Sequence, residues 1–189
     1  MERIDKIATL FLNSLNSAVT DPVWQFFSNR WVWAPLYIAV LVLLFVRLGW
    51  KRALIVTLSI ILTILACDQF ANLIKNWACR LRPSHDEWML SNGLHLLEKP
   101  GSLYGFFSAH AANAFGFATA SLLGLRNDKT THYNVYAWLI YLWAALVSLS
   151  RIFVGKHFLG DVLTGTVVGL LFGFLLALAA RKIILSLES

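Results

Sequence analysis

The sequence predicts an all-α protein, a polytopic membrane bundle of five or six transmembrane helices that begins with an amphipathic or short spanning helix. Composition supports this prediction, because hydrophobic residues make up 58% of the 189 residues and charged residues only 14%. The pattern supports it too, because apolar runs of about twenty residues, long enough to cross a bilayer, recur along the chain. A chain of this length is typical of one domain, so we expect a single membrane domain over residues 1–189.

The first apolar segment, residues 4–19, is shorter and more polar than the later ones. Ile4, Ile7 and Phe11 fall on one face of a helix, whereas Asn13 interrupts the other face. This pattern favours an amphipathic helix that lies in the membrane interface. A short sixth span is the alternative.

The later apolar runs predict five spans and one further helix start. Asp21 and Pro22 begin a helix, because proline is favoured at the first helical position. The spans are expected over residues 31–48, 53–77, 106–125, 134–150 and 158–180. Gly160, Gly165 and Gly169 in the last span suit close packing against another helix. Between the second and third spans, residues 84–105 form the longest polar loop, which we expect to be a solvated connector.

The polar candidates fall at span ends on one side of the membrane. If successive spans alternate in direction, the end of the second, the start of the third, the end of the fourth and the start of the fifth lie together. These ends carry Lys75, Arg82, Ser108, His110, Ser150, Arg151, His157 and Asp161. We therefore expect one site, built from several helix ends.

The remaining cations predict which way that site faces. The opposite side carries seven of them, Arg47, Lys51, Arg52, Arg126, Lys129, Arg181 and Lys182. The site's own side carries four, Arg30, Arg80, Lys99 and Lys156. By the positive-inside rule, the excess places the site on the extracytoplasmic side of the membrane.

The end of the second span concentrates charge. Asp68, Lys75 and Arg82 share one helical stripe by their spacing, and Pro83 ends the helix at Arg82. Asp68 lies deeper, so we expect it to pair with a cation or a polar neighbour inside the bundle. Arg80 is expected to extend to the membrane interface.

Two histidines stand at helix starts. His157 and Asp161 are four residues apart, so a helix would place them on one face, where the carboxylate can hold the imidazole. Ser108 and His110 begin the third span, where free backbone N–H groups favour an anion. A histidine beside an apolar helix also serves as a packing residue, and Asn113 either orients His110 or packs.

Nucleic acid, metals and disulfides are not expected. The net charge of +6 is explained by membrane orientation and a phosphate pocket better than by nucleic acid. His85 and His95 form no metal-ligand pattern with cysteines or carboxylates, so we interpret them as surface residues. Cys67 and Cys79 would lie roughly 18 Å apart on one helix, too far for a disulfide.

Three sequence patterns together resemble the signature of the type 2 phosphatidic acid phosphatase superfamily. The first is Lys75 followed, after six residues, by Arg82 and Pro83. The second is Ser108-Ala109-His110. The third is Ser150-Arg151, five residues, His157, three residues and Asp161. The first and third match the family spacing, whereas the second has Phe107-Ser108-Ala109-His110 where the family usually has Pro-Ser-Gly-His. The signature spans residues 75–161.

The resemblance implies hydrolysis of a phosphate ester or diphosphate through a phosphohistidine, without a metal or another cofactor. In this scheme His157 is the nucleophile, Asp161 orients it, and His110 protonates the leaving group. The remaining motif residues would bind phosphate oxygens: Lys75, Arg82, Ser108 and Arg151. Asp68, Asn113 and Ser150 are candidates for a supporting role.

We therefore expect a lipid phosphatase in the bacterial inner membrane. Undecaprenyl diphosphate, a lipid A phosphate and phosphatidylglycerophosphate are the candidate substrates, and an outward-facing site favours the first two. One alternative is a phosphotransferase that passes the phosphoryl group to a lipid or sugar. A non-catalytic transporter is the alternative from another class, but its site would be expected near the bilayer midplane rather than at span ends. The sequence leaves the oligomeric state open.

Overall fold

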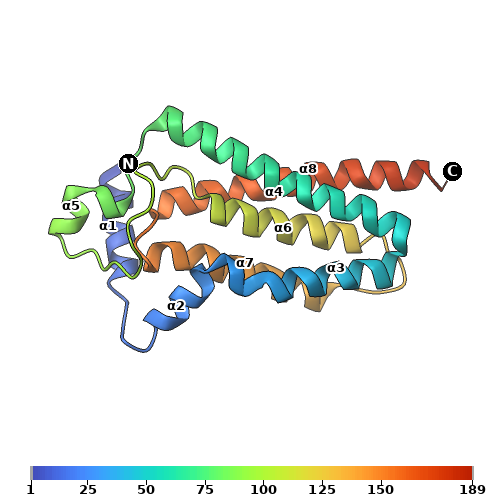
Figure 1. Ribbon diagram of the computed structural model, residues 1–189, viewed down its shortest axis with the longest axis horizontal. Coiled ribbons are helices and arrows are strands. Elements are labelled where there is room, and N and C mark those ends of the chain that lie inside the picture. The colour runs from blue at the N-terminus through green and yellow to red at the C-terminus, as the bar shows by residue number, and fades with distance from the viewer. Residues whose placement is uncertain (1, 189) are drawn as a thin grey trace.

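The computed structural model describes residues 2–188, whose regular structure is helical (Figure 1). In chain order the helices are α1 (Glu2–Asn13), α2 (Asp21–Ser28), the 3-10 turn η1 (Arg30–Trp33), α3 (Ala34–Leu48), α4 (Trp50–Ala78), the 3-10 turn η2 (Pro83–His85), α5 (Glu87–Ser91), α6 (Ala109–Leu125), α7 (Asn134–Phe153) and α8 (Leu159–Ser186). Among the described residues there is no β-strand, only an isolated bridge between Leu81 and Tyr104.

Long helices run side by side to form a bundle, and the short helices gather at one end of it (Figure 1). Within residues 2–188, four segments are long and apolar enough to cross a membrane, Arg30–Leu48, Trp50–Ala78, Asn134–Phe153 and Leu159–Ser186. The central helix α6 has 17 residues, about 25 Å at the usual helical rise. It is largely buried among α4, α7 and α8. The prediction of an all-α membrane bundle is confirmed.

Glycines bring α6 and α8 into backbone contact. A Cβ atom at Gly173 would lie 2.7 Å from the carbonyl oxygen of Gly116, and one at Gly169 would overlap the carbonyl oxygen of Ala112. Gly165 faces the carbonyl oxygen of Ser108 in the same way. Three successive turns of α8 thus lie directly against α6.

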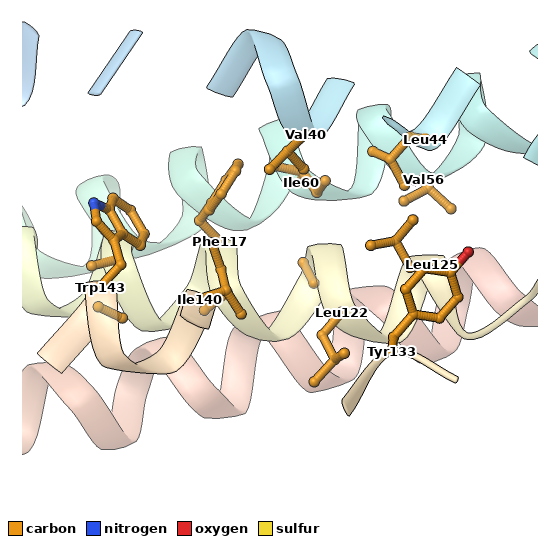
Figure 2. Packing of buried hydrophobic residues seen from close by; sticks show 14 of the residues in the cluster. Val40, Leu44, Val56, Ile60, Phe117, Leu122, Leu125, Tyr133, Ile140 and Trp143 are labelled. Carbon is orange, nitrogen blue, oxygen red and sulfur yellow. The ribbon is translucent and has the colours of Figure 1, made fainter. Parts of the chain in front are cut away.

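The main apolar core fills the space between α3, α4, α6 and α7 (Figure 2). Its labelled members are Val40, Leu44, Val56, Ile60, Phe117, Leu122, Leu125, Tyr133, Ile140 and Trp143. Trp143 at one end of this core also lines the cavity described below. The core therefore packs the membrane-embedded part of the bundle together and borders the cavity at one end.

The observed helix ends differ from the predicted ones by several residues. Helix α4 stops at Ala78, because Cys79 adopts a left-handed conformation with φ of 47°. Arg82 is extended instead of helical, as expected for a residue before proline, so it is not on the helical stripe of Lys75. Helices α7 and α8 run beyond their predicted ends, and α6 begins at Ala109 instead of residue 106.

Helix α1 lies across the end of the bundle (Figure 1). Its 12 residues reach about 18 Å, less than the hydrocarbon thickness of a bilayer. Ile4, Ile7 and Phe11 are exposed on its outer side, whereas Thr9 and Asn13 are fully buried. Length and orientation both favour the interfacial helix over a sixth span.

Candidate active site

One cavity of about 580 Å³ brings together the polar helix ends. Its lining includes His157 from the α7–α8 loop, His110 from the start of α6 and Lys75 from the last turn of α4. Arg82 and Arg151 line the same cavity. Two histidines and three cations, separated by up to 82 positions in the chain (75 to 157), thus face one space.

His157 has a polar partner at each ring nitrogen. Its Nε2 lies 3.3 Å from Nη1 of Arg82, and its Nδ1 lies 3.4 Å from Oδ2 of Asp161. A guanidinium group only donates hydrogen bonds, so Nε2 is the accepting nitrogen and carries the lone pair. Nδ1 then holds the ring proton and faces the carboxylate. This tautomer leaves the lone pair of Nε2 inside the cavity, which is the form that nucleophilic attack by a histidine requires.

The surroundings also keep the imidazole neutral. Burial lowers the pKa of His157 well below its usual value, and the positive charges of Arg82, Arg151 and Lys75 lower it further. The side chain is almost completely buried, with 2% relative exposure. A neutral ring is the form that can attack an electrophile, so burial favours nucleophilic chemistry here.

Arg82 is held by the loop that follows α5. Its Nε donates to the carbonyl oxygen of Tyr104 at 3.2 Å, and its Nη2 donates to Oγ of Ser102 at 3.1 Å. A Cβ atom at Gly105 would lie 2.9 Å from Cγ of Arg82, so this glycine permits the close approach. The interpretation of residues 84–105 as a solvated connector is therefore wrong for its last part.

Arg151 is buried against α2 at the edge of the cavity. Its Nη1 donates to the carbonyl oxygen of Ser28 at 3.3 Å and to the Ser28 hydroxyl, and it lies 4.0 Å from Oε1 of Glu98. Its Nε is buried and has no hydrogen-bond partner in the part of the chain that the structure describes. Glu98 also pairs with Lys156 at 3.6 Å. Arg151 therefore keeps an unused donor beside the cavity.

Ser108 and Ser150 lie behind the cavity wall. The Ser108 hydroxyl accepts from the backbone N–H of Ala111 at 3.4 Å and so caps α6, and its own N–H donates to the carbonyl oxygen of Asp161 at 3.0 Å. Ser150 donates to the carbonyl oxygen of Val147 within its own helix. Neither lines the cavity, although both are candidates by sequence. Ala109 is the first residue of α6, a position that needs no glycine.

Asp68 and Asn113 form a polar pair on the cavity wall. Nδ2 of Asn113 donates to Oδ1 of Asp68 at 2.8 Å. The predicted polar partner of Asp68 is therefore Asn113, while the hydrogen bond of Asn113 does not go to His110. Oδ1 of Asn113 is buried without a partner, so it remains able to accept from a ligand.

Sequence reasoning missed several residues around the site. Arg80 is not an interfacial cation, because it pairs with Asp161 at 2.7 Å. Arg30 lines the cavity and lies over the ring of Trp31 at 5.1 Å. Aromatic side chains complete the wall: Trp31, Trp33, Tyr37, Phe117 and Trp143. Charge and aromaticity were visible in the sequence, but only the fold brings these residues beside the histidines.

The two loop histidines lie outside the cavity. Nε2 of His85 lies 3.1 Å from the carbonyl oxygen of Gly101, and Nε2 of His95 lies 2.9 Å from Oδ2 of Asp21. Within residues 2–188, no cluster of three or more His, Cys, Asp or Glu side chains is arranged to hold a metal ion.

Comparison with known proteins gives consistent matches along the chain. A family model described as the PAP2 superfamily matches residues 52–184. A lipid A 4'-phosphatase of Bacteroides thetaiotaomicron is 32% identical over 188 residues, which cover 98% of this chain and 81% of that protein. A lipid A 4'-phosphatase of Porphyromonas gingivalis is 32% identical over 171 residues, or 90% of this chain and 70% of that protein.

The fold also matches a solved structure. The crystal structure of a transmembrane PAP2-type phosphatidylglycerolphosphate phosphatase from Bacillus subtilis superposes with a TM-score of 0.77. The match covers 96% of this chain and 87% of that one, at 21% sequence identity. At this identity, the likeness is evidence for a common fold.

Proposed function

Since this chain belongs to the PAP2 superfamily and is a membrane lipid phosphatase, we propose that it hydrolyses a phosphate on the sugar headgroup of a lipid A-type glycolipid. Both relatives reported above carry the name lipid A 4'-phosphatase. The cavity wall is compatible with this substrate, because aromatic rings such as Trp31 and Trp33 stand beside the cations. A phosphorylated sugar offers both an anion for the cations and an apolar face for the rings.

The first chemical step is attack by His157 on phosphorus. Nε2 forms a bond to the phosphorus atom while the bond from phosphorus to the sugar oxygen breaks. Asp161 keeps the proton on Nδ1 and stabilises the positive charge that develops on the ring. Lys75, Arg82 and Arg151 meet the charge on the phosphoryl oxygens, which is the main requirement of a loose transition state.

His110 serves the leaving group and then the water molecule. In its protonated form it gives a proton to the departing sugar oxygen, so that the oxygen leaves as a hydroxyl and the His110 ring becomes neutral. In the second step, His110 takes a proton from water while the water oxygen attacks the phosphohistidine. The bond from Nε2 to phosphorus breaks, inorganic phosphate leaves, and both histidines return to their first states.

The site is assigned to the extracytoplasmic face of the inner membrane. The support is the excess of cations at the opposite end of the bundle, where Arg47, Lys51 and Arg52 lie. The C-terminal end of α8 is also at that end, whereas α1 and the cavity are at the other (Figure 1). A glycolipid substrate would then reach the site from the outer leaflet.

The observation that carries the proposal is the single cavity that contains both histidines and the three motif cations. The test is release of inorganic phosphate by purified protein from four lipids: lipid A phosphorylated only at position 4', lipid A phosphorylated only at position 1, phosphatidylglycerophosphate and undecaprenyl diphosphate. We expect the highest kcat/KM for the 4'-phosphate. His157→Ala protein is the matched control for contaminating phosphatases.

Two outcomes would contradict the proposal in different ways. A clear preference for phosphatidylglycerophosphate or undecaprenyl diphosphate would reject the glycolipid substrate but keep the phosphatase. Transfer of phosphate to an added sugar or lipid, with little free phosphate, would identify a phosphotransferase.

A chelator should leave phosphate release unchanged, and vanadate should inhibit it as a phosphoryl mimic.

A further inference from the structure

The polar face of α1 is turned toward the catalytic loop, residues 152–160, which joins α7 to α8 and carries His157. Asp5, Thr9 and Asn13 are four residues apart, so they form one stripe on the helix. Oδ1 of Asp5 accepts from the N–H of Gly160 at 2.8 Å, and Oγ1 of Thr9 accepts from the N–H of Leu159 at 2.9 Å. These N–H groups belong to the first turn of α8 and have no partner within that helix.

The same stripe continues to the end of α7. Nδ2 of Asn13 donates to the carbonyl oxygens of Ile152 and Phe153, each at 3.1 Å. Helix α1 thus contacts both the end of α7 and the start of α8. The segment between them carries His157, so α1 holds the loop of the nucleophile from both sides.

Arg80 connects α1 to the carboxylate beside His157. Its Nη2 donates to Oδ2 of Asp5 at 2.5 Å and its Nη1 donates to Oδ1 of Asp161 at 2.7 Å. The guanidinium also lies over the ring of Phe158, 4.3 Å from its centroid. A planar fork that bridges two carboxylates fixes the orientation of both.

The other oxygen of Asp161 is left for His157. Oδ2 accepts from the backbone N–H of Phe158 at 3.0 Å and lies 3.4 Å from Nδ1 of His157. Because Arg80 engages Oδ1, the carboxylate cannot rotate without breaking a charge-assisted hydrogen bond. The contact with Arg80 therefore determines which oxygen faces the imidazole.

Arg80 reaches Asp161 from the side away from the substrate. Asp5 and Arg80 line a second cavity of about 980 Å³, whereas His157 and Arg82 line the first. Arg80 is therefore not placed to bind the phosphoryl group. Its charge is balanced by Asp5, so that Asp5, Arg80 and Asp161 together carry one negative charge, which suits the imidazolium formed at His157.

We propose that Asp5 and Arg80 are positioning residues for the reaction, which act on His157 through Asp161, and that α1 serves to place Asp5 there. This inference rests on the proposed roles of His157 and Asp161. It assigns a role in turnover to the N-terminal helix, which lies outside the signature region at residues 75–161.

The first test uses Asp5→Asn, with Glu2→Gln as the matched control on the same helix. The side chain of Glu2 is mainly exposed, and its Oε1 lies 3.3 Å from Nζ of Lys6 on the same helix. We expect Asp5→Asn to lower kcat about tenfold, the effect of losing one charge-assisted hydrogen bond, with little change in KM. Glu2→Gln should retain the wild-type kcat. An unchanged kcat in Asp5→Asn would overturn the proposal.

A double-mutant cycle separates positioning from a general loss of structure. If Asp5 acts through Asp161, adding Asp5→Asn to Asp161→Asn should cause no further loss of kcat. If Asp5→Asn lowered kcat tenfold both in the wild type and in Asp161→Asn, Asp5 would only support the fold, and the proposal would be rejected. Wild-type turnover by Asp161→Asn alone would instead refute the proposed roles of His157 and Asp161. The failure of this inference and the failure of the proposed function are therefore distinguishable.

Two further variants test the arrangement without removing any carboxyl group from the chain. A Cβ atom at Gly160 would lie 2.8 Å from Oδ2 of Asp5, so Gly160→Ala should displace Asp5 and reproduce the loss in Asp5→Asn. Arg80→Lys keeps the charge but not the planar fork, so its kcat should fall between those of wild type and Arg80→Ala. Equal rates in Arg80→Lys and Arg80→Ala would overturn the bridging role, as would wild-type kcat in Gly160→Ala.

Discussion

At the scale of single residues, the two histidines of the cavity have different surroundings. His157 has a guanidinium at Nε2 and a carboxylate at Nδ1, whereas no carboxylate within residues 2–188 is paired with His110. The surroundings of His157 suit a nucleophile, because the carboxylate stabilises the positive charge that develops on the ring during attack. Those of His110 leave a ring free to exchange protons with substrate and water.

This difference predicts that His157→Ala and His110→Ala have different effects on formation of the phosphoenzyme. His157→Ala should abolish turnover, because the side chain proposed to form the phosphoenzyme is removed. His110→Ala should still form some phosphoenzyme with an aryl phosphate, whose leaving group needs no proton. The measurement is an acid-labile, base-stable phosphate trapped on the protein after rapid quenching. Ordinary turnover by His157→Ala would remove His157 from the nucleophile's role.

The pH dependence of phosphoenzyme formation provides another prediction. Burial and then the charges of Arg82 and Arg151 lower the pKa of His157, so the neutral nucleophile persists as the pH falls below the usual histidine value of about 6.5. The rate should therefore fall only at lower pH. In Arg82→Gln the remaining rate should fall at higher pH than in wild type, because one charge that lowers the pKa is gone.

The ionisation of the substrate contributes to the pH profiles of wild type and Arg82→Gln alike. A phosphate monoester has a second pKa near 6, so it affects the wild-type and Arg82→Gln profiles equally, and their difference reports on the enzyme. Identical profiles would mean that Arg82 does not influence the ionisation of His157.

Short sequence patterns could predict the residues that face the cavity, but not those that orient them. His157 and Asp161 are four positions apart, so helical spacing alone places them together. Arg80 was misinterpreted because its two partners, Asp5 and Asp161, are 75 and 81 positions away. No local pattern distinguishes such an arginine from one that extends to the membrane interface.

At the scale of helices, α6 and α8 carry the site as a unit. His110 is in the first turn of α6, and His157 lies two residues before the start of α8. The close contact of the two backbones at Gly165, Gly169 and Gly173 holds these helices in one register. The distance between the two histidines is therefore set by packing along the bundle as well as by the loop.

We predict that Gly169→Ala destabilises the protein and lowers its activity, although the residue is remote from the cavity lining. The added methyl group overlaps the carbonyl oxygen of Ala112, and overpacking of this kind costs about 1–3 kcal/mol. The measurement is the unfolding midpoint in micelles together with kcat. The control Val167→Ala changes a lipid-facing side chain and should have little effect. Unchanged stability in Gly169→Ala would contradict the close packing.

The helices were more predictable than their ends and their orientation. Apolar runs predict the long helices, since a membrane span must be apolar over its whole length. The end of α4 depends on the left-handed Cys79, which propensity does not favour. For α1, the apolar face predicts an interfacial helix, but the hydrogen bonds of Thr9 to Leu159 and of Asn13 to Ile152 join residues more than 130 positions apart.

At the scale of the whole molecule, Cys79 tests which side of the membrane the site faces. Cys79 is exposed at the site end of α4, and Cys67 is buried within the bundle. In cells with an intact inner membrane, a small membrane-impermeant thiol reagent should label wild-type protein but not Cys79→Ser. Labelling that requires rupture of the inner membrane would place the site on the cytoplasmic side.

Because of the orientation of α1, we expect the surrounding lipid to influence kcat. Its polar stripe contacts the catalytic loop while Ile4, Ile7 and Phe11 face outward, so a bilayer that solvates this outer face favours the docked helix. In thermodynamic terms, the membrane binds one conformation preferentially and shifts the population toward it. We therefore expect kcat to differ between vesicles and micelles, and Asp5→Asn, which weakens the docking contact, to widen that difference.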